Sequence, residues 1–377
     1  MKILQLSSAS TLGGGERHFA DLSNALAARG HEVFAALRPG APLRERLGLP
    51  DANVITLPLR NALDVASASR LAAFARDRQI QIVHAHVARD YPLAAHAARL
   101  AKGTRLVLTR HVPFALNSLH RIALANVSRV IAVSAGVARK LREQGIFAPD
   151  KISVIPNGVD FDHYDRALEG FDREKYRRTL SASARLLVGT VGELSETKGQ
   201  EDLLRAAASV VGGSGSARAS GRGVPGVEFL IVGEDHSEDQ RTRRRLEQIV
   251  EEENLRGRVH FRGYAPDLPR LLAALDVYVS ASRAEAFGLA TVEAMICGAP
   301  VVATATDGSR EIVEDDRTGK LVPVGNVEAL AAALVELLED GRERERLGTN
   351  ALHSVTERFS LKRMVDETER IYRSVLA

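Results

Sequence analysis

Two carboxylates, Glu285 and Glu293, lie eight positions apart in the sequence, with a glycine, Gly288, between them. Ionised carboxylates only accept hydrogen bonds, so they suit ligands that are rich in hydroxyl groups, such as a hexose or a ribose. If a helix starts at Gly288, Glu285 lies on the preceding loop and Glu293 lies about one and a half turns into the helix. The arrangement therefore indicates a site that grips a sugar nucleotide.

The segments around these residues would position them. Residues 275–280 form an apolar run that predicts a buried strand, and residues 289–297 predict a helix. The backbone N–H groups of Phe287, Gly288 and Leu289 would then have no acceptors within the helix. Because Gly288 has no side chain, a diphosphate can come close to these groups.

A pair of glutamates at helical spacing also occurs by chance on solvated helix faces. Here the Phe-Gly-Leu insert and the Gly-Ala-Pro-Val-Val segment at residues 298–302 accompany the pair. At these residues the chain resembles the retaining family-4 glycosyltransferases of GT-B fold, whose signature is a Glu, seven residues, a second Glu and a Gly-Xaa-Pro-Val-Val strand. The resemblance covers essentially the whole chain and is strongest over residues 186–325.

Lys198 and Gly199 open the helix that follows the predicted strand at residues 186–191. An ammonium group beside a helix N-terminus is placed for a diphosphate, and a charge-assisted hydrogen bond of this kind contributes about 1.5–3 kcal/mol. The alternative is an exposed lysine in the first helical turn. The sequence departs from the commoner family pattern at Glu193, where many members carry an arginine as a second cation for the phosphates.

Gly13-Gly14-Gly15 follows the predicted strand at residues 2–7 and precedes a helix near residues 16–29. The loop lacks the spacing of a dinucleotide fingerprint or of a Walker loop, so a plain turn is the alternative to a phosphate site. In the family that the chain resembles, this loop lies against the donor phosphates. The resemblance therefore implies Gly14 as a donor contact.

Three histidines follow or occupy predicted strands of the first half. The resemblance puts His111, just after the predicted strand at residues 105–109, beside the anomeric centre of the donor sugar. His84 and His86 alternate along the predicted strand at residues 82–86 and so face one side. A metal site would need a third ligand that nothing nearby clearly supplies, so no metal is expected. Two roles stay open for His84 and His86: they could line the acceptor side of the site as polar groups, or they could be structural residues.

A chain of 377 residues exceeds what one hydrophobic core usually supports, so two domains are expected. Strands alternate with helices in both halves, which predicts an α/β fold with parallel sheets. The resemblance implies GT-B architecture, with two Rossmann-like domains whose sheets face each other across a cleft. We predict an acceptor-binding domain over residues 1–160 and a nucleotide-sugar-binding domain over residues 161–356. Residues 357–377 would form a helix that crosses back to the first domain.

Composition narrows the class of protein. Cys297 is the only cysteine, which excludes an internal disulfide and a cysteine-rich metal site and fits a reducing cytosol. The apolar run at the N-terminus is too short for a signal peptide, and no stretch approaches the roughly 18 apolar residues of a membrane span. The Gly/Ser-rich stretch at residues 212–223 is typical of a tolerated surface insertion. We therefore expect a cytoplasmic protein.

Charge is unevenly distributed along the chain. Residues 1–160 carry 21 Lys and Arg against 11 Asp and Glu, a balance of +10, whereas residues 161–377 carry 30 against 37, a balance of −7. A basic half suggests an anionic partner, either a phosphorylated acceptor or an anionic membrane surface at the inner face of the cell membrane. The alternative is that the arginines only solvate helices.

The segment at residues 110–129 carries the membrane hypothesis. Its apolar side chains alternate with His120 and Arg121 as in an interfacial helix; they are Phe114, Leu116, Leu119, Ile122 and Leu124. Nucleic acid is not expected as a partner, because the chain has no Trp, only six Tyr and no recognition motif.

The resemblance implies a retaining, metal-independent hexosyltransferase. It would move a hexosyl unit from a UDP- or GDP-sugar to a lipid-linked or anionic hydroxyl acceptor, in glycan, glycolipid or cell-envelope polysaccharide synthesis. His111, Glu285 and Lys198 would act in catalysis, and the donor is a substrate, so no cofactor is expected. Two alternatives stay open: a sugar-nucleotide epimerase of the same fold, and a catalytically silent sugar-nucleotide-binding subunit, with which Glu193 is compatible.

Overall fold

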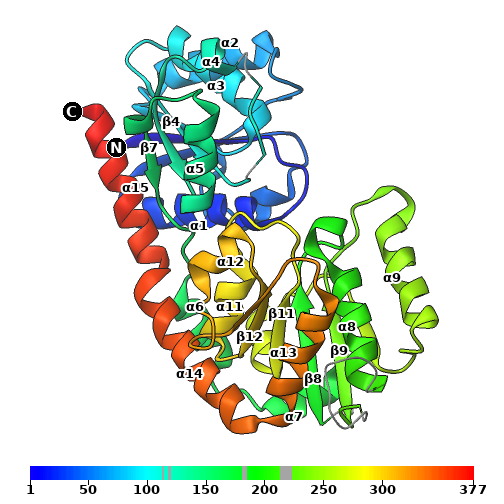
Figure 1. Ribbon diagram of the computed structural model, residues 1–377. Coiled ribbons are helices and arrows are strands. Elements are labelled where there is room, and N and C mark those ends of the chain that lie inside the picture. The colour runs from blue at the N-terminus through cyan, green and yellow to red at the C-terminus, as the bar shows by residue number, and fades with distance from the viewer. Residues whose placement is uncertain (113, 118–119, 181–184, 213–222) are drawn as a thin grey trace. The chain divides into compact units, whose positions relative to one another are not determined.

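The computed structural model describes residues 1–112, 114–117, 120–180, 185–212 and 223–377 (Figure 1). The chain divides into two compact units, of which the first comprises Met1–Gly158 and Leu361–Ala377 and the second comprises Val159–Ser360. The sequence placed the domain boundaries at residues 160 and 357. Each unit has its own sheet and its own hydrophobic core.

The first unit is built on a parallel sheet of seven strands in the order β3-β2-β1-β4-β5-β6-β7. The strands are β1 Lys2–Ser7, β2 Glu32–Leu37, β3 Val54–Thr56, β4 Ile82–Ala85, β5 Arg105–Arg110, β6 Val127–Ala132 and β7 Ile152–Val154. The helices are α1 Gly14–Ala28, α2 Val65–Asp77, α3 Tyr91–Leu100, α4 His120–Ala123, α5 Ala135–Gln144 and α15 Leu361–Leu376.

The C-terminal helix α15 belongs to the core of this first unit (Figure 1). Met364, Val365 and Tyr372 are buried in the cluster that also contains residues of α1 and β2. Parallel sheets are covered by helices on both faces, so their central strands are apolar along their whole length. This is why β1 and β4 are mostly apolar and almost wholly buried, with Gln5 and His84 as buried polar exceptions.

The second unit is built on a parallel sheet of six strands in the order β10-β9-β8-β11-β12-β13. The strands are β8 Leu186–Val191, β9 Val227–Val232, β10 Val259–Arg262, β11 Val277–Ser280, β12 Val301–Thr304 and β13 Lys320–Val322. The helices are α6 Phe161–Leu168, α7 Arg173–Thr179, α8 Gln200–Gly212, α9 Arg241–Glu252, α10 Leu268–Ala273, α11 Leu289–Ile296, α12 Asp307–Ile312, α13 Val327–Glu339 and α14 Gly341–Arg358.

The predicted fold class, parallel α/β sheets in both halves, is confirmed. The strands that the sequence did not predict are β3, β7 and β13. Each has three residues and lies at an edge of its sheet. Edge strands of this length are too short and too exposed to give a clear hydrophobic pattern.

The predicted interfacial helix at residues 110–129 is wrong. The described part of this segment contains only the short α4, and β6 already begins at Val127. Leu116 and Leu124 are buried, so they are not available to a membrane, whereas Phe114 and Ile122 are 64% and 77% exposed. Leu119, like most of the Gly/Ser-rich stretch, lies outside the described residues.

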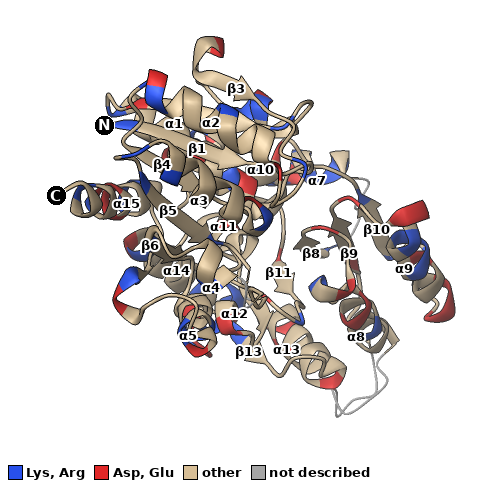
Figure 2. Ribbon diagram, turned by 90° about the horizontal axis from the view of Figure 1, so that it is seen from above, with Lys and Arg blue, Asp and Glu red and all other residues tan. Residues whose placement is uncertain are grey.

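The surface helix α9 carries charges of both signs, which is typical of a solvated helix (Figure 2). Only three of its residues, Leu246, Ile249 and Val250, are buried. Across the part of the chain that the structure describes, we find no helix with the length and apolar character needed to cross a membrane.

Candidate active site

Lys198 and Glu285 form an ion pair in the second unit. Nζ of Lys198 lies 2.6 Å from Oε2 of Glu285, and the hydroxyl of Ser282 donates a second hydrogen bond of 3.3 Å to the same oxygen. The two side chains of the pair are 32% and 15% exposed, so solvent reaches them. Two of the three predicted catalytic side chains thus lie together, and the third, His111, belongs to the first unit.

The turn between β8 and α8 holds Lys198. After β8 the chain forms one 3₁₀ turn, Glu196–Lys198, and then passes through Gly199, whose φ is +64°. A Cβ at position 199 would lie 2.1 Å from the carbonyl oxygen of Ala281. Only glycine therefore lets this turn pack against the chain that leads to Glu285.

A second contact ties the Glu285 loop to the Lys198 turn. The guanidinium of Arg283 donates two hydrogen bonds, of 3.0 and 2.9 Å, to the carboxylate of Asp202 on α8. The backbone N–H of Arg283 also donates to the carbonyl oxygen of Thr197 at 2.7 Å. Two-point pairing of this kind fixes orientation as well as distance. The sequence analysis missed Arg283 and Asp202, because no local pattern links residues 81 positions apart.

Two glycines shape the loop that carries Glu285. Gly288 precedes α11 with a φ of +107°, a conformation that favours glycine. Gly308, near the start of α12, donates its N–H to the carbonyl oxygen of Glu285 at 3.1 Å. A Cβ at position 308 would lie 2.6 Å from the carbonyl oxygen of Phe287. Gly308 was not predicted from the sequence, because the need for glycine at this position arises only from the packing against residues 285–287.

Phe287 and Leu289 flank Gly288 at the start of α11. The side chain of Phe287 is buried, with its ring edge-on to Phe359 at a centroid distance of 5.4 Å. Leu289 is the first residue of α11. The groups of these residues that suit an anionic ligand are therefore the backbone N–H groups at the helix start.

Glu293 lies in α11 with no solvent exposure, although the sequence predicted a position facing the ligand. Burial raises the pKa of Tyr278 on β11, and the negative charges of Glu285 and Glu293 raise it further. Burial also raises the pKa of the Cys297 thiol, again with a contribution from Glu293. The two glutamates thus lie near the phenol of Tyr278. Glu285 is partly exposed, whereas Glu293 is fully buried.

Glu193, which replaces the arginine common in the family, is exposed beside a surface hollow of about 620 Å³. His236, Arg241 and Arg245 line the same hollow. Arg245 faces acidic partners, with its Nε 3.8 Å from a carboxylate oxygen of Glu201. Two arginines of α9 therefore lie near the position where the family pattern has its second cation.

In the first unit, α1 begins at Gly14, two residues earlier than predicted. The carboxylate of Glu16 accepts a 2.9 Å hydrogen bond from the N–H of Gly13 and so closes the first turn. Gly14 is exposed, and the space that its Cβ would take is empty. A Cβ on Gly15 would lie 3.4 Å from Cγ of His111. The glycine loop and His111, which the sequence selected separately, are therefore in contact.

His84 is a structural residue. It is completely buried, and its Nδ1 and Nε2 lie 2.6 Å from the hydroxyls of Tyr372 and Thr109. A role for His84 in lining an acceptor site is therefore wrong, because both ring nitrogens are satisfied inside the core. Through Tyr372, this histidine instead connects β4 to α15.

His86 and His111 meet a third histidine, His18 of α1, that the sequence analysis did not select. One ring nitrogen of each lies within 4.8 Å of the others. Burial lowers the pKa of His18 to about 4, an effect that the side chain of Asn157 partly opposes. Burial, together with charge on neighbouring imidazoles, lowers the pKa values of His86 and His111 well below their usual range. All three imidazoles are therefore neutral at pH 7.

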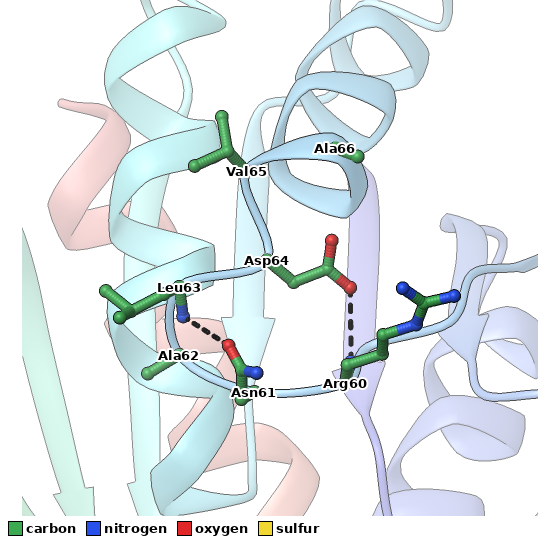
Figure 3. A pocket seen from close by; sticks show the side chains of 7 residues that line it. All are labelled: Arg60, Asn61, Ala62, Leu63, Asp64, Val65 and Ala66. Atoms are coloured by element: carbon green, nitrogen blue, oxygen red, sulfur yellow. Dashed lines mark hydrogen bonds between the residues drawn. The ribbon is translucent and has the colours of Figure 1, made fainter.

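A further hollow lies in the first unit and is lined by the consecutive residues Arg60–Ala66 (Figure 3). The loop is held by its own hydrogen bonds, from the N–H of Leu63 to Asn61 and from the N–H of Arg60 to Asp64. Asp64 also caps α2 by accepting from the N–H of Ser67. None of the predicted site residues lines this hollow, whose shape follows from one turn before a helix.

Several known proteins are similar to this chain over nearly its whole length. N-acetyl-alpha-D-glucosaminyl L-malate synthase of Bacillus anthracis is 27% identical, with 97% of this chain and 95% of the relative covered. The lipopolysaccharide core biosynthesis glycosyltransferase LpsE of Rhizobium meliloti is 27% identical, with 94% of each chain covered. The crystal structure of Anabaena HepE in complex with UDP-glucose is 26% identical, covers 99% of this chain and all of the other, and has a TM-score of 0.85.

Two family models match, one in each half. Residues 12–163 match the model of Glycosyltransferase Family 4, and residues 172–354 match the model of Glycosyl transferases group 1. The order of the two matches follows the two sheets of the structure, and the structural relatives are GT-B glycosyltransferases. The chain therefore belongs to the glycosyltransferases that these two models describe, the group 1 and family 4 enzymes of GT-B fold.

Proposed function

We propose that this chain transfers a hexosyl unit from a nucleotide diphosphate sugar to an acceptor hydroxyl, with retention of the anomeric configuration. The observation that carries the proposal is the Lys198–Glu285 pair, whose charged atoms lie 2.6 Å apart on the loops before α8 and α11. The cation suits the diphosphate of the donor, and the neighbouring carboxylate suits the hydroxyl groups of its sugar. The likeness to HepE, a structure that contains UDP-glucose, supports the same donor class.

Each residue of the second unit takes a role that fits its surroundings. Lys198 and the N–H groups at the start of α11 hold the diphosphate, because both present positive charge. Glu285 accepts hydrogen bonds from hexose hydroxyls. Glu293 holds the ribose, which requires that the donor reach a carboxylate that is fully buried in the structure. From the first unit, Gly14 contacts the phosphates and His111 contacts the reacting sugar.

The reaction needs no protein nucleophile in this proposal. The bond between the anomeric carbon and the diphosphate oxygen breaks, and a bond to the acceptor oxygen forms on the same face. The departing phosphate takes the proton of the acceptor hydroxyl. Lys198 and the helix N–H groups stabilise the negative charge that develops on the phosphate, so the scheme requires no divalent metal.

Donor binding can be tested without an acceptor by measuring the thermal unfolding temperature with UDP- and GDP-sugars. A ligand that binds only the folded state stabilises it by RT ln(1 + [L]/Kd), or about 2.7 kcal/mol at a hundredfold excess over Kd. We expect at least one sugar nucleotide to raise the unfolding temperature, and Lys198→Ala to remove most of that shift. Lys175→Ala, a change at an exposed lysine of α7, is the matched control. Absence of any shift across the panel would contradict the proposal.

Product analysis separates the proposed transfer from other activities. A retaining transferase forms a product whose anomeric configuration, read by NMR, equals that of the donor. An epimerase would convert the donor without an acceptor, and a silent subunit would bind nucleotide but turn over with no acceptor. An inverted product would rule out the retaining mechanism.

The acceptor is proposed to be anionic or to lie at an anionic surface. Residues 1–160 carry a balance of +10, and Arg121 lies next to the exposed Ile122. Attraction to an anionic membrane contributes about 1 kcal/mol per cation near the surface and is screened by salt. Co-sedimentation with anionic but not neutral liposomes, weakened by salt, would support a membrane-bound acceptor. Equal or absent sedimentation would favour a small anionic acceptor in solution.

A further inference from the structure

His18 is a buried polar side chain that lacks hydrogen bonds of normal geometry. The residue is 3% exposed, and apart from an interaction with the side chain of Asn157 neither Nδ1 nor Nε2 has a hydrogen-bond partner. Buried polar groups are nearly always satisfied, so an exception points to a bound water, an ion or a functional role. His111 adds a second such atom, since its buried Nδ1 also has no partner. Two of the three adjacent imidazoles thus have buried nitrogens that make no hydrogen bond of normal geometry.

The spacing of the histidines fits a tetrahedral metal. Nδ1 of His86 lies 3.3 Å from Nε2 of His111. Zinc binds imidazole nitrogens at about 2.0–2.1 Å, and tetrahedral angles then place two ligand nitrogens about 3.3 Å apart. The ligand atom of His18 lies within 4.8 Å of the other two, so a side-chain adjustment of an ångström or two would complete the set.

The fold fixes this set of imidazoles. His86 and His111 directly follow β4 and β5, which are neighbours in the sheet, and His18 lies in the helix that follows the adjacent strand β1. Nε2 of His86 lies 2.8 Å from Oε1 of Gln5 on β1. An amide oxygen only accepts, so Nε2 carries the proton and Nδ1 presents its lone pair to the cluster. Metal-binding histidines are commonly oriented by such a second hydrogen bond.

An ordinary hydrogen bond between His86 and His111 accounts for only part of these observations. It would use one nitrogen of each ring, but His18 would keep only its interaction with the side chain of Asn157. A shared cation would take up one nitrogen of each of the three rings. The partial exposure of His111 leaves a route for an ion to enter.

We propose that His18, His86 and His111 form a binding site for a divalent transition metal of the zinc class, with a fourth position left for water or another small ligand. Three imidazoles suit zinc, copper, nickel and cobalt rather than magnesium or calcium, which prefer oxygen ligands. The site lies in the first unit, apart from the Lys198–Glu285 pair of the second unit, but it shares His111 with the reaction proposed above. Metal binding itself needs no sugar donor, so it can be tested independently of that reaction.

Metal binding can be measured directly on the full chain, with no sugar substrate. Protein stripped with a chelator and then desalted is dialysed against micromolar Zn²⁺ or Co²⁺, and bound metal is counted by mass spectrometry. We expect one ion per chain, and a visible Co²⁺ absorption band of the intensity that four-coordinate nitrogen sites give. His18→Phe, which keeps a ring of similar size without ligand nitrogens, and His86→Ala should each weaken binding at least about tenfold.

His353→Ala is the matched control, because His353 lies on α14 in the second unit with its side chain 79% exposed. It should bind metal as the unaltered chain does. Circular dichroism and thermal unfolding establish which variants are folded, and the Co²⁺ spectrum of the unaltered chain tests imidazole ligation even if His18→Phe fails to fold. The proposal is overturned if the unaltered chain binds no ion, if Co²⁺ shows only the weak absorption of a six-coordinate ion, or if folded His18→Phe binds normally.

Discussion

Nζ of Lys198 lies 2.6 Å from Oε2 of Glu285, so the cation assigned to the diphosphate and the carboxylate assigned to the hexose neutralise each other before a donor arrives. A partly exposed ion pair of this kind contributes only about 0–1 kcal/mol to the free energy of unfolding. The pair is held in place by the Arg283–Asp202 contact between its two loops. We infer that its main contribution is to ligand binding.

Replacing Glu285 by alanine should lower turnover on the order of a hundredfold, because the change removes a contact to the reacting sugar. The unfolding temperature should change little, because an ion pair that solvent reaches contributes only about 0–1 kcal/mol to the free energy of unfolding. Steady-state kinetics with the donor found by the binding screen would measure the effect. Glu345→Ala, at an exposed glutamate of α14, is the control and should keep full activity. Unchanged kinetics in Glu285→Ala would remove this residue from the site.

The two members of the pair should show coupled effects on donor affinity. Lys198→Ala should weaken binding of the nucleotide diphosphate about tenfold or more, because a charge-assisted contact of about 1.5–3 kcal/mol is lost. Glu285→Ala also releases Lys198 from its partner, so the effects of the two changes should not add. Calorimetric titration of the single and double variants would give the coupling free energy. Strict additivity would show that the 2.6 Å contact is irrelevant to donor binding.

Glu293 should affect nucleotide affinity more than turnover. Glu293→Gln preserves the shape of a fully buried side chain, so the fold should be retained while the carboxylate is lost. We expect a rise of KM for the donor with kcat within a few-fold of the unaltered chain, as for a contact made equally in ground and transition states. Steady-state kinetics would test this. A fall of kcat with unchanged KM would instead place Glu293 at the reacting centre.

The sequence was most informative where a local pattern reflects a local requirement. The central strands were predictable because a sheet covered on both faces needs mostly apolar residues, as in the Val-Val-Ala-Thr sequence of β12. Glu285 and Lys198 were each selected, but their pairing depends on a contact between Arg283 and Asp202 that no short motif encodes. His18 was missed for a similar reason.

His18 gains its significance from two other histidines, His86 and His111, which follow two different strands and lie beside it. A single histidine in a helix carries no sequence signal of its own. The burial of Glu293 was likewise unpredictable, because helical spacing gives a face of the helix but does not say what covers it.

Transfer activity should survive chelation. Lys198 and the N–H groups at the start of α11 already place positive charge where the diphosphate is expected, so the proposed reaction does not need a metal. Initial rates measured with and without EDTA, after desalting, would test this expectation. Complete loss of activity that Mn²⁺ or Mg²⁺ restores would contradict the mechanism.

Added Zn²⁺ should, in contrast, lower the transfer rate. If the ion occupies the proposed histidine site, it binds Nε2 of His111, which is then not available to the reacting sugar.

Gly308 offers a test of the loop itself. A Cβ at this position would lie 2.6 Å from the carbonyl oxygen of Phe287, and 2.8 and 2.9 Å from other backbone atoms of residues 285–287. Backbone cannot move aside as a flexible side chain can, so Gly308→Ala should shift the loop and cost about 1–3 kcal/mol of stability. It should also weaken donor binding, because Glu285 and the start of α11 move with the loop.

Gly263→Ala is the matched control for this change. Its Cβ would meet nothing within 4 Å, and the residue is not among the positive-φ glycines. We expect Gly263→Ala to have the unfolding temperature and the donor affinity of the unaltered chain. Gly308→Ala should unfold at a temperature several degrees lower and bind the donor more weakly. Thermal unfolding and calorimetric titration would measure the two quantities. If Gly308→Ala lost stability but kept full donor affinity, the loop would be a structural feature and the donor would not depend on its position.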